Sequence, residues 1–163
     1  MPDQFTERLQ LFSSSDNVNR LNRLQRGIEK ESLRVGLDGK LAQTPHPESL
    51  GSALTHPHIT TDFSEALLEF ITPVSTDIEE SLQTLDNIHR YTYQQLDGEL
   101  LWAASMPCIL EGDENIPVAQ YGSSNVAKMK TAYRQGLGNR YGRLMQTISG
   151  FTFIFLLISS KSF

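Results

Sequence analysis

The stretch "RGIEKESLRV" (residues 26–35) alternates in a way that is typical of a β-strand. Because side chains alternate between the two faces of a strand, Glu29 and Glu31 lie on one face together with two apolar residues. The next stretch, "LDGKL" (37–41), contains an Asp-Gly pair, which is a strong signal for a hairpin turn. This region therefore predicts a strand and hairpin with two carboxylates on a face that is not simply solvated.

A second acidic segment is "TTDFSEALLEFITP" (60–73), in a region with β-strand character from Ile59 onward. Glu69 lies between a leucine and a phenylalanine in an almost wholly apolar strand. Asp62 is interpreted either as a further member of this acidic set or as an ordinary loop or turn residue. Two strands that carry carboxylates among apolar residues point to a bound cation.

The acidic strands allow two interpretations. Unpaired carboxylates on a partly apolar face are costly, and Mg²⁺ is a natural partner because it prefers oxygen ligands and phosphate oxygens. Carboxylates from adjacent strands could hold more than one ion against a nucleoside triphosphate. The alternative is a salt-bridged surface, since Arg26, Lys30 and Arg34 are near in sequence. For Glu29 and Glu31, spacing alone favours the salt-bridged surface.

Composition indicates an ordinary globular chain. It has 163 residues, 39% of them hydrophobic, and a formal net charge of −5, which fits one domain and argues against a nucleic-acid partner. Cys108 is the single cysteine, so an intramolecular disulfide is excluded. We interpret it as a buried thiol. The N-terminal residues lack the features of a secretory signal, and the apolar run 148–160 is too short to span a bilayer. These features predict a cytoplasmic protein without a membrane partner.

The other segments are predicted from apolar spacing and capping signals. Helices are expected around 5–12, 18–24 and 126–146, the last interrupted by glycines. The clearest helix begins at a capping box of Thr76 and Glu79 and ends before Gly98. The proline-rich stretch 43–58 is expected to be a loop with solvated histidines. The scaffold is thus a mixture of strands, helices and long loops.

Several stretches occur together: "RGIEKESLRV", "HPESLGSALTHPHITTDFSEALLEFITPV", "SMPC", "AQYGSSN" and "YRQGLGNRYGRLMQTISG". In this order they resemble the proteobacterial glutamate–cysteine ligase family, from about Arg26 to Gly150. The resemblance implies an α+β fold whose antiparallel sheet is similar to that of glutamine synthetase. It also implies that residues 1–150 are the N-terminal part of the catalytic domain, so that the sheet is incomplete in this chain.

The resemblance implies an ATP-dependent ligation, the first step of glutathione synthesis. The side-chain carboxylate of L-glutamate takes the γ-phosphoryl group of ATP, and the amino group of L-cysteine then attacks the acyl phosphate. Mg²⁺ is the implied metal, because phosphoryl transfer requires positioning and charge neutralisation at the phosphates. The expected partners are therefore the three small molecules L-glutamate, L-cysteine and ATP.

The family's functional residues can be carried over to matching positions. Its metal-binding carboxylates fall on four acids, Glu29, Glu31, Asp62 and Glu69. Its cysteine-pocket tyrosine falls on Tyr133, which by sequence alone reads as an amphipathic core residue, and Gln146 is expected to line the same pocket. No residue is assigned as catalytic, because the nucleophile belongs to the substrate and Cys108 has no such role.

The sequence departs from the family after Gly150. The family has a metal-binding histidine where this chain has Thr152. We hypothesise that a frameshift produced residues 151–163, a non-family tail that is expected to have nothing to pack on. Full-length members are far longer. The isolated chain is therefore expected to fold poorly and to lack ligase activity, and at most to be a Mg²⁺- or nucleotide-binding remnant or a split-enzyme partner.

Overall fold

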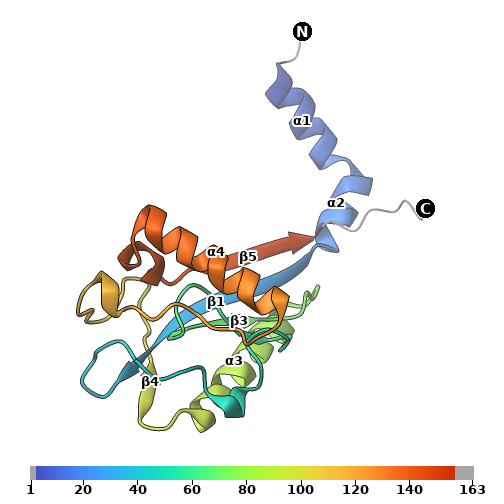
Figure 1. Cartoon of the computed structure of the whole chain (residues 1–163). Helices are drawn as coiled ribbons and strands as arrows, with labels where there is room; N and C mark the ends of the chain where they lie inside the picture. The colour runs from blue at the N-terminus through green and yellow to red at the C-terminus, as the bar shows by residue number, and fades with distance from the viewer. Residues whose placement is uncertain (1–2, 157–163) are drawn as a thin grey trace.

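The computed structural model describes residues 3–156 and contains one antiparallel sheet (Figure 1). The strand order is β2-β3-β1-β4, and the fifth strand, β5, also pairs with β1. The strands are β1 (Gln25–Gly36), β2 (Ile59–Thr61), β3 (Leu67–Ile71), β4 (Glu99–Leu101) and β5 (Phe151–Leu156). The long strand β1 is the centre of the sheet, because three of the other strands pair with it. The α+β class expected from the sequence is confirmed.

Four α-helices accompany the sheet: α1 (Gln4–Ser13), α2 (Ser15–Asn22), α3 (Ile78–Gln95) and α4 (Asn125–Tyr141). The first two project away from the body of the molecule, and none of their residues is buried (Figure 1). Three short 3₁₀ turns lie in the loops: η1 (Glu48–Leu50), η2 (Asp113–Asn115) and η3 (Leu144–Thr147). No described helix is long and apolar enough to cross a membrane.

The two faces of the sheet have separate cores. On one face, Ile28 and Phe70 pack with Leu85 and Ile88 of α3. On the other face, the apolar residues at the end of β1 pack with Phe63, and Leu137 of α4 adjoins this cluster. α3 and α4 therefore cover opposite faces. The face that carries Glu29 and Glu31 is the α4 face, since side chains alternate along β1.

The hairpin after β1 forms as the sequence predicts. The N–H of Gly36 donates to the carbonyl of Lys40 at 2.9 Å, and Gly39 has a φ of +79°. Such a positive φ favours glycine, which has no Cβ to clash with the backbone. The cap of α1 is Asp3, whose carboxylate accepts from the N–H of Thr6. Cys108 is buried, as expected for a lone thiol.

Two predictions about helices are wrong. The cap of α3 is Asp77, whose side chain accepts from the N–H of Glu79, and not Thr76. The helix α4 runs unbroken through Gly136 and Gly138 and ends at Tyr141, with Gly142 as its C-cap at a φ of +80°. For α3, a competing cap residue lies one position after the predicted one. For α4, the two glycines weaken the helix but do not break it.

The histidines of the 43–58 loop are half-buried and not solvated as expected. The Nδ1 atom of His56 accepts hydrogen bonds from the N–H groups of His58 at 3.1 Å and Ile59 at 2.9 Å. This ring therefore caps the start of β2 and has a structural role. Burial lowers the pKa of His56, which favours the neutral ring that can accept these hydrogen bonds.

The segment after Gly150 does have something to pack on, which corrects the expectation. Residues 151–156 form β5 and pair with β1, with Phe151 opposite Lys30 and Thr152 opposite Glu29. The remaining residues of the expected tail, 157–163, lie outside the described residues. Because Gly150 and Glu31 are joined through their backbones at 2.9 Å, this segment adds directly to the acidic part of the sheet.

Candidate metal centre

The acids predicted from β1 and β3 meet on one face of the sheet. Glu31 lies directly opposite Glu69 in the antiparallel register, and Glu29 lies two residues earlier on the same face. Directly opposed residues have Cβ atoms about 4.5–5.5 Å apart, so the carboxylates of Glu31 and Glu69 are neighbours. Asp62 follows β2 and its N–H donates to the carbonyl of Leu67 at 3.0 Å, which closes the turn before β3.

Two of the acids, Glu31 and Glu69, have raised pKa values. Burial raises the pKa of Glu69 to about 7, and the charges of Asp62, Glu29 and Glu31 add to this effect in that order. Burial also raises the pKa of Glu31, and the charges of Asp62 and Glu29 raise it further. The four carboxylates therefore form one electrostatic unit. A bound cation would stabilise such a cluster, because it relieves the repulsion between the carboxylates.

Glu31 is held by the segment that enters β5. Its Oε2 atom accepts from the N–H of Gly150 at 2.6 Å, a contact that lowers the pKa of Glu31 and partly opposes the effect of burial. A Cβ on Gly150 would lie 3.3 Å from this carboxylate, which is tighter than most real Cβ contacts. The absence of a side chain at Gly150 thus lets the backbone approach the carboxylate closely.

Asp62 is held by the α4 side of the molecule. The Tyr121 hydroxyl donates to the carbonyl oxygens of Thr61 at 2.6 Å and Asp62 at 2.9 Å. The Nε–H of Arg134 donates to the same Asp62 carbonyl, and its Nη2 lies 3.9 Å from the Asp62 carboxylate. Arg134 also lies over the Tyr121 ring, 4.8 Å from the ring centre. Its positive charge lowers the pKa of Glu69 and so offsets part of the repulsion.

The salt-bridged alternative for Glu29 and Glu31 is wrong. Arg26 donates to the carbonyls of Leu24 and Thr76. Lys30 donates to Ser32, and burial lowers its pKa.

Arg34 lies on the opposite face from the acids and is fully buried. It pairs with Glu99 at 2.6 Å and donates to the side chain and backbone of Thr44. None of the three nearby cations therefore neutralises the acidic face.

The four carboxylates suit Mg²⁺ as ligands, but they do not complete its coordination shell. All four side chains offer carboxylate oxygens, which this ion prefers. Within residues 3–156, however, no three His, Cys, Asp or Glu side chains converge closely enough to hold a metal ion. The acids therefore form one wall of a site. This acidic wall consists of Glu29, Glu31, Asp62 and Glu69. The remaining ligands of such an ion would be water, phosphate oxygens or other protein groups.

The two residues predicted to bind substrate are not joined to this wall. Tyr133 lies on α4 and is 65% exposed, so it is not the core residue that spacing alone suggests. Gln146 lies in η3, half-buried, and its N–H donates to the carbonyl of Arg143 at 3.0 Å. Among the described residues, neither side chain has a hydrogen bond to the four carboxylates.

Sequence reasoning missed Tyr121, Arg134 and Gly150. The first two act on Asp62 from about 60 and 70 positions away, a pairing that no local spacing reveals. Gly150 was visible only as the last residue of a motif. A faint signal was available, because Arg134 directly follows Tyr133 in one of the quoted stretches.

Comparison with known proteins identifies the family. A profile described as "Glutamate-cysteine ligase" matches residues 9–161, a range that continues past the point where the motif changes. Glutamate–cysteine ligase of Alcanivorax borkumensis is 58% identical over 149 residues, and that of Saccharophagus degradans is 61% identical over 143. These matches cover 91% and 88% of the chain. The chain spans only 28% and 27% of the two relatives.

Solved structures agree. A glutamate–cysteine ligase from Francisella tularensis in complex with AMP superimposes with a TM-score of 0.79 and 42% identity, over 82% of this chain and 27% of that one. A bifunctional glutathione synthetase from Pasteurella multocida gives a TM-score of 0.74 and 33% identity, over 97% of this chain and 19% of that one. With its sheet, its acidic wall and these matches, the chain belongs to the glutamate–cysteine ligase family.

Proposed function

We propose that the chain supplies the acidic wall of a Mg²⁺–ATP site in a glutamate–cysteine ligase. The observation that carries this proposal is the direct opposition of Glu31 and Glu69, with Glu29 and Asp62 in the same electrostatic unit. The related structure with bound AMP supports a nucleotide as the partner of this region. A cytoplasmic location is part of the proposal, because ATP is available there.

The proposed reaction joins L-glutamate to L-cysteine. The side-chain carboxylate of glutamate attacks the γ-phosphorus of ATP, ADP leaves, and an acyl phosphate forms. The cysteine amino group then attacks the acyl carbon and releases phosphate, which yields γ-glutamylcysteine. Bound Mg²⁺ supplies charge neutralisation at the phosphate oxygens.

The chain's own residues would serve this chemistry by position and charge. Glu29, Glu31, Asp62 and Glu69 would hold Mg²⁺. Gly150 fixes one oxygen of Glu31, and Arg134 fixes the backbone of Asp62. Tyr133 and Gln146 are proposed for the cysteine pocket on the strength of the family motif. The exposure of Tyr133 leaves its ring available for contact with a substrate or with another part of the protein.

A second candidate is binding without turnover. It is favoured by Thr152, which lies opposite Glu29 where the family motif has a metal-binding histidine. The neutral hydroxyl of Thr152 does not reproduce the imidazole that the family motif has at this position. In that case the chain acts as a Mg²⁺–nucleotide-binding part, or as a partner that pairs with a separately encoded remainder. The frameshift stays a prediction, which the DNA around codon 150 tests.

Binding of a fluorescent ATP analogue to the purified chain separates these functions. We expect binding that requires Mg²⁺ and is lost in the Glu31→Gln/Glu69→Gln double variant, with Glu7→Gln on the projecting helix α1 as the control. γ-Glutamylcysteine formation in the same sample indicates the full ligase. Binding without product indicates the second candidate. Binding that is absent, or equal with and without Mg²⁺, contradicts both.

A further inference from the structure

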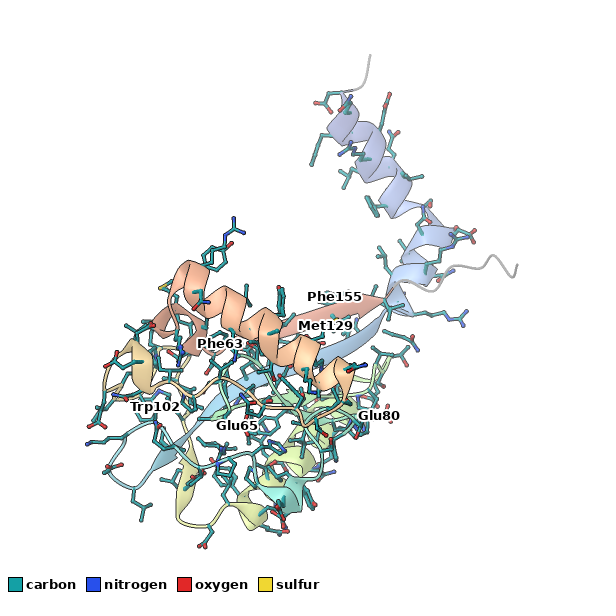
Figure 2. The ribbon with its side chains drawn as sticks, in the orientation of Figure 1. Phe63, Glu65, Glu80, Trp102, Met129 and Phe155 are labelled. Carbon is teal, nitrogen blue, oxygen red and sulfur yellow. The ribbon has the colours of Figure 1, made fainter. Side chains whose placement is uncertain are left out.

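Glu65 is a buried carboxylate with no part in the acidic wall. It is 8% exposed and lies in the loop between Asp62 and β3, in the interior of the folded body (Figure 2). Its Oε2 accepts from the N–H of Gln120 at 2.6 Å, and its Oε1 accepts from the N–H of His46 at 3.0 Å. Hydrogen bonds to a buried charged group are among the stronger ones in proteins, so this side chain fixes both partner segments firmly.

The segment 117–121 lies antiparallel against the loop that contains Glu65. The N–H of Glu65 donates to the carbonyl of Pro117, and the N–H of Ala119 donates to the carbonyl of Phe63, each at 2.9 Å. Gln120 comes next, with its N–H on the Glu65 carboxylate. The following residue is Tyr121, which is buried.

The Tyr121 hydroxyl returns to the acidic wall. It donates to the backbone carbonyls of Thr61 and Asp62 at 2.6 and 2.9 Å. The hydrogen bond of Glu65 to Gln120 is therefore one residue away from the ring that holds Asp62. Arg34 anchors the same loop from the other face of the sheet, because its Nη2 donates to the Glu65 carbonyl at 3.1 Å.

We propose that Glu65 is a positioning residue for Asp62 and acts through Gln120 and Tyr121. Its carboxylate sets the path of segment 117–121, which sets the Tyr121 ring, whose hydroxyl holds the Asp62 backbone. The inference rests on the proposed function in one respect, that Asp62 is a Mg²⁺ ligand. The link from Glu65 to the Asp62 backbone is independent of that assignment.

A double-mutant cycle tests this chain of contacts. Glu65→Gln keeps the size of the side chain but places an amide where one oxygen now accepts, and Tyr121→Phe removes only the hydroxyl. Each variant is expected to weaken Mg²⁺ binding about 10-fold, a typical loss when a residue that orients a metal ligand is changed. The double variant is expected to lose no more than either single one, because both changes break the same chain.

The controls are Glu48→Gln, an exposed acid in the neighbouring loop, and Tyr93→Phe, an exposed tyrosine on α3, and both are expected to leave Mg²⁺ affinity unchanged. A merely structural Glu65 would lower the unfolding midpoint and leave the Mg²⁺ affinity of the folded chain unaltered, which overturns the proposal. Additive losses in the double variant overturn it as well. If Glu65→Gln does not fold, Tyr121→Phe against Tyr93→Phe decides, and an unchanged Mg²⁺ affinity in Tyr121→Phe overturns the proposal.

Amide hydrogen exchange separates this inference from the proposed function. In both single variants the N–H groups of Asp62 and Ala119 are expected to exchange faster, while those of β1 keep their wild-type rates. If the wild-type chain shows no Mg²⁺ response, the proposed function fails, and local acceleration of these two amides still supports the positioning role. Unchanged exchange at both amides, or equal acceleration across the sheet, overturns it.

Discussion

At the residue scale, Glu69 sets the pH dependence of this fold. Its pKa rises from the ordinary 4.5 to about 7 in the folded chain, chiefly because of burial. A raised pKa means that the folded state binds the proton more tightly than the unfolded state. The stability that this proton contributes is therefore complete below about pH 4.5 and is lost as the pH rises through about 7.

Glu69→Gln should remove this dependence. Between pH 5 and pH 8 the wild type is expected to lose about 1 kcal/mol of unfolding free energy relative to the variant, after allowance for solvent screening of a half-buried group. Urea unfolding at a series of pH values measures the difference. The exposed Glu48→Gln variant should run parallel to the wild type. Parallel curves for Glu69→Gln would show that Glu69 has an ordinary pKa.

Sequence spacing revealed the acids but not their partners. Alternation placed Glu29 and Glu31 on one face correctly, because the period of a strand is fixed. It did not show that the nearby cations leave these acids unpaired. The side chains of Arg26, Lys30 and Arg34 contact other groups. The assignment of Asp62 to the same set came from the family motif. Its anchors lie in segments that only the folded chain brings near.

At the element scale, the cap of α3 offers a direct test of a boundary. Asp77 accepts from the N–H of Glu79 at 2.9 Å, so Asp77→Ala is expected to cost about 1 kcal/mol of unfolding free energy. Thr76→Ala should cost close to nothing, because Thr76 is not the cap. Chemical unfolding of both variants measures this. A larger loss for Thr76→Ala would restore the capping box that the sequence suggested.

The strand β5 is an edge strand of the described sheet. Its residues "FTFIFL" carry no charge, and Phe151, Phe153 and Phe155 are all exposed on one face. Among residues 3–156, no strand pairs with its other edge. An uncharged, apolar edge strand is a template for pairing with another chain, so we expect the purified chain to self-associate as its concentration rises.

Phe153→Lys should reduce this association, because a charge on an edge strand opposes strand pairing. Light scattering over a concentration series measures it, and Phe5→Lys on the projecting helix α1 serves as the matched control. Equal suppression by both variants would assign the association to exposed apolar surface in general. No concentration dependence in the wild type would contradict the role of the edge.

Element types were predictable because their signals are local, and boundaries were less so. The hairpin and the two acidic strands follow from turn chemistry and alternation. The unbroken path of α4 through two glycines and the folding of the histidine loop depend on packing that a local pattern does not contain. The same holds for β5, whose sequence predicts a strand while its partner, β1, lies over a hundred residues earlier.

At the scale of the whole molecule, the chain is a sheet with helices on both faces and one acidic wall. It spans just over a quarter of the length of its relatives, and the described acids do not by themselves close a metal shell. Family resemblance predicts a metal site at these acids, and the structure shows that they lie close enough to affect one another's charge. Metal binding at the acidic wall is therefore the part of the proposed function that can be tested with this chain alone.

Calorimetric titration of Mg²⁺ near pH 6.5, in two buffers of different ionisation enthalpy, tests the wall most directly. We predict binding with release of a proton, because Mg²⁺ competes with the proton that Glu69 holds, and an affinity that increases towards pH 8. Glu69→Gln should bind more weakly and release fewer protons, because Glu31 is then the remaining acid with a raised pKa. Absence of binding, or binding that is the same in Glu69→Gln and at both pH values, would contradict a Mg²⁺ site at these four carboxylates.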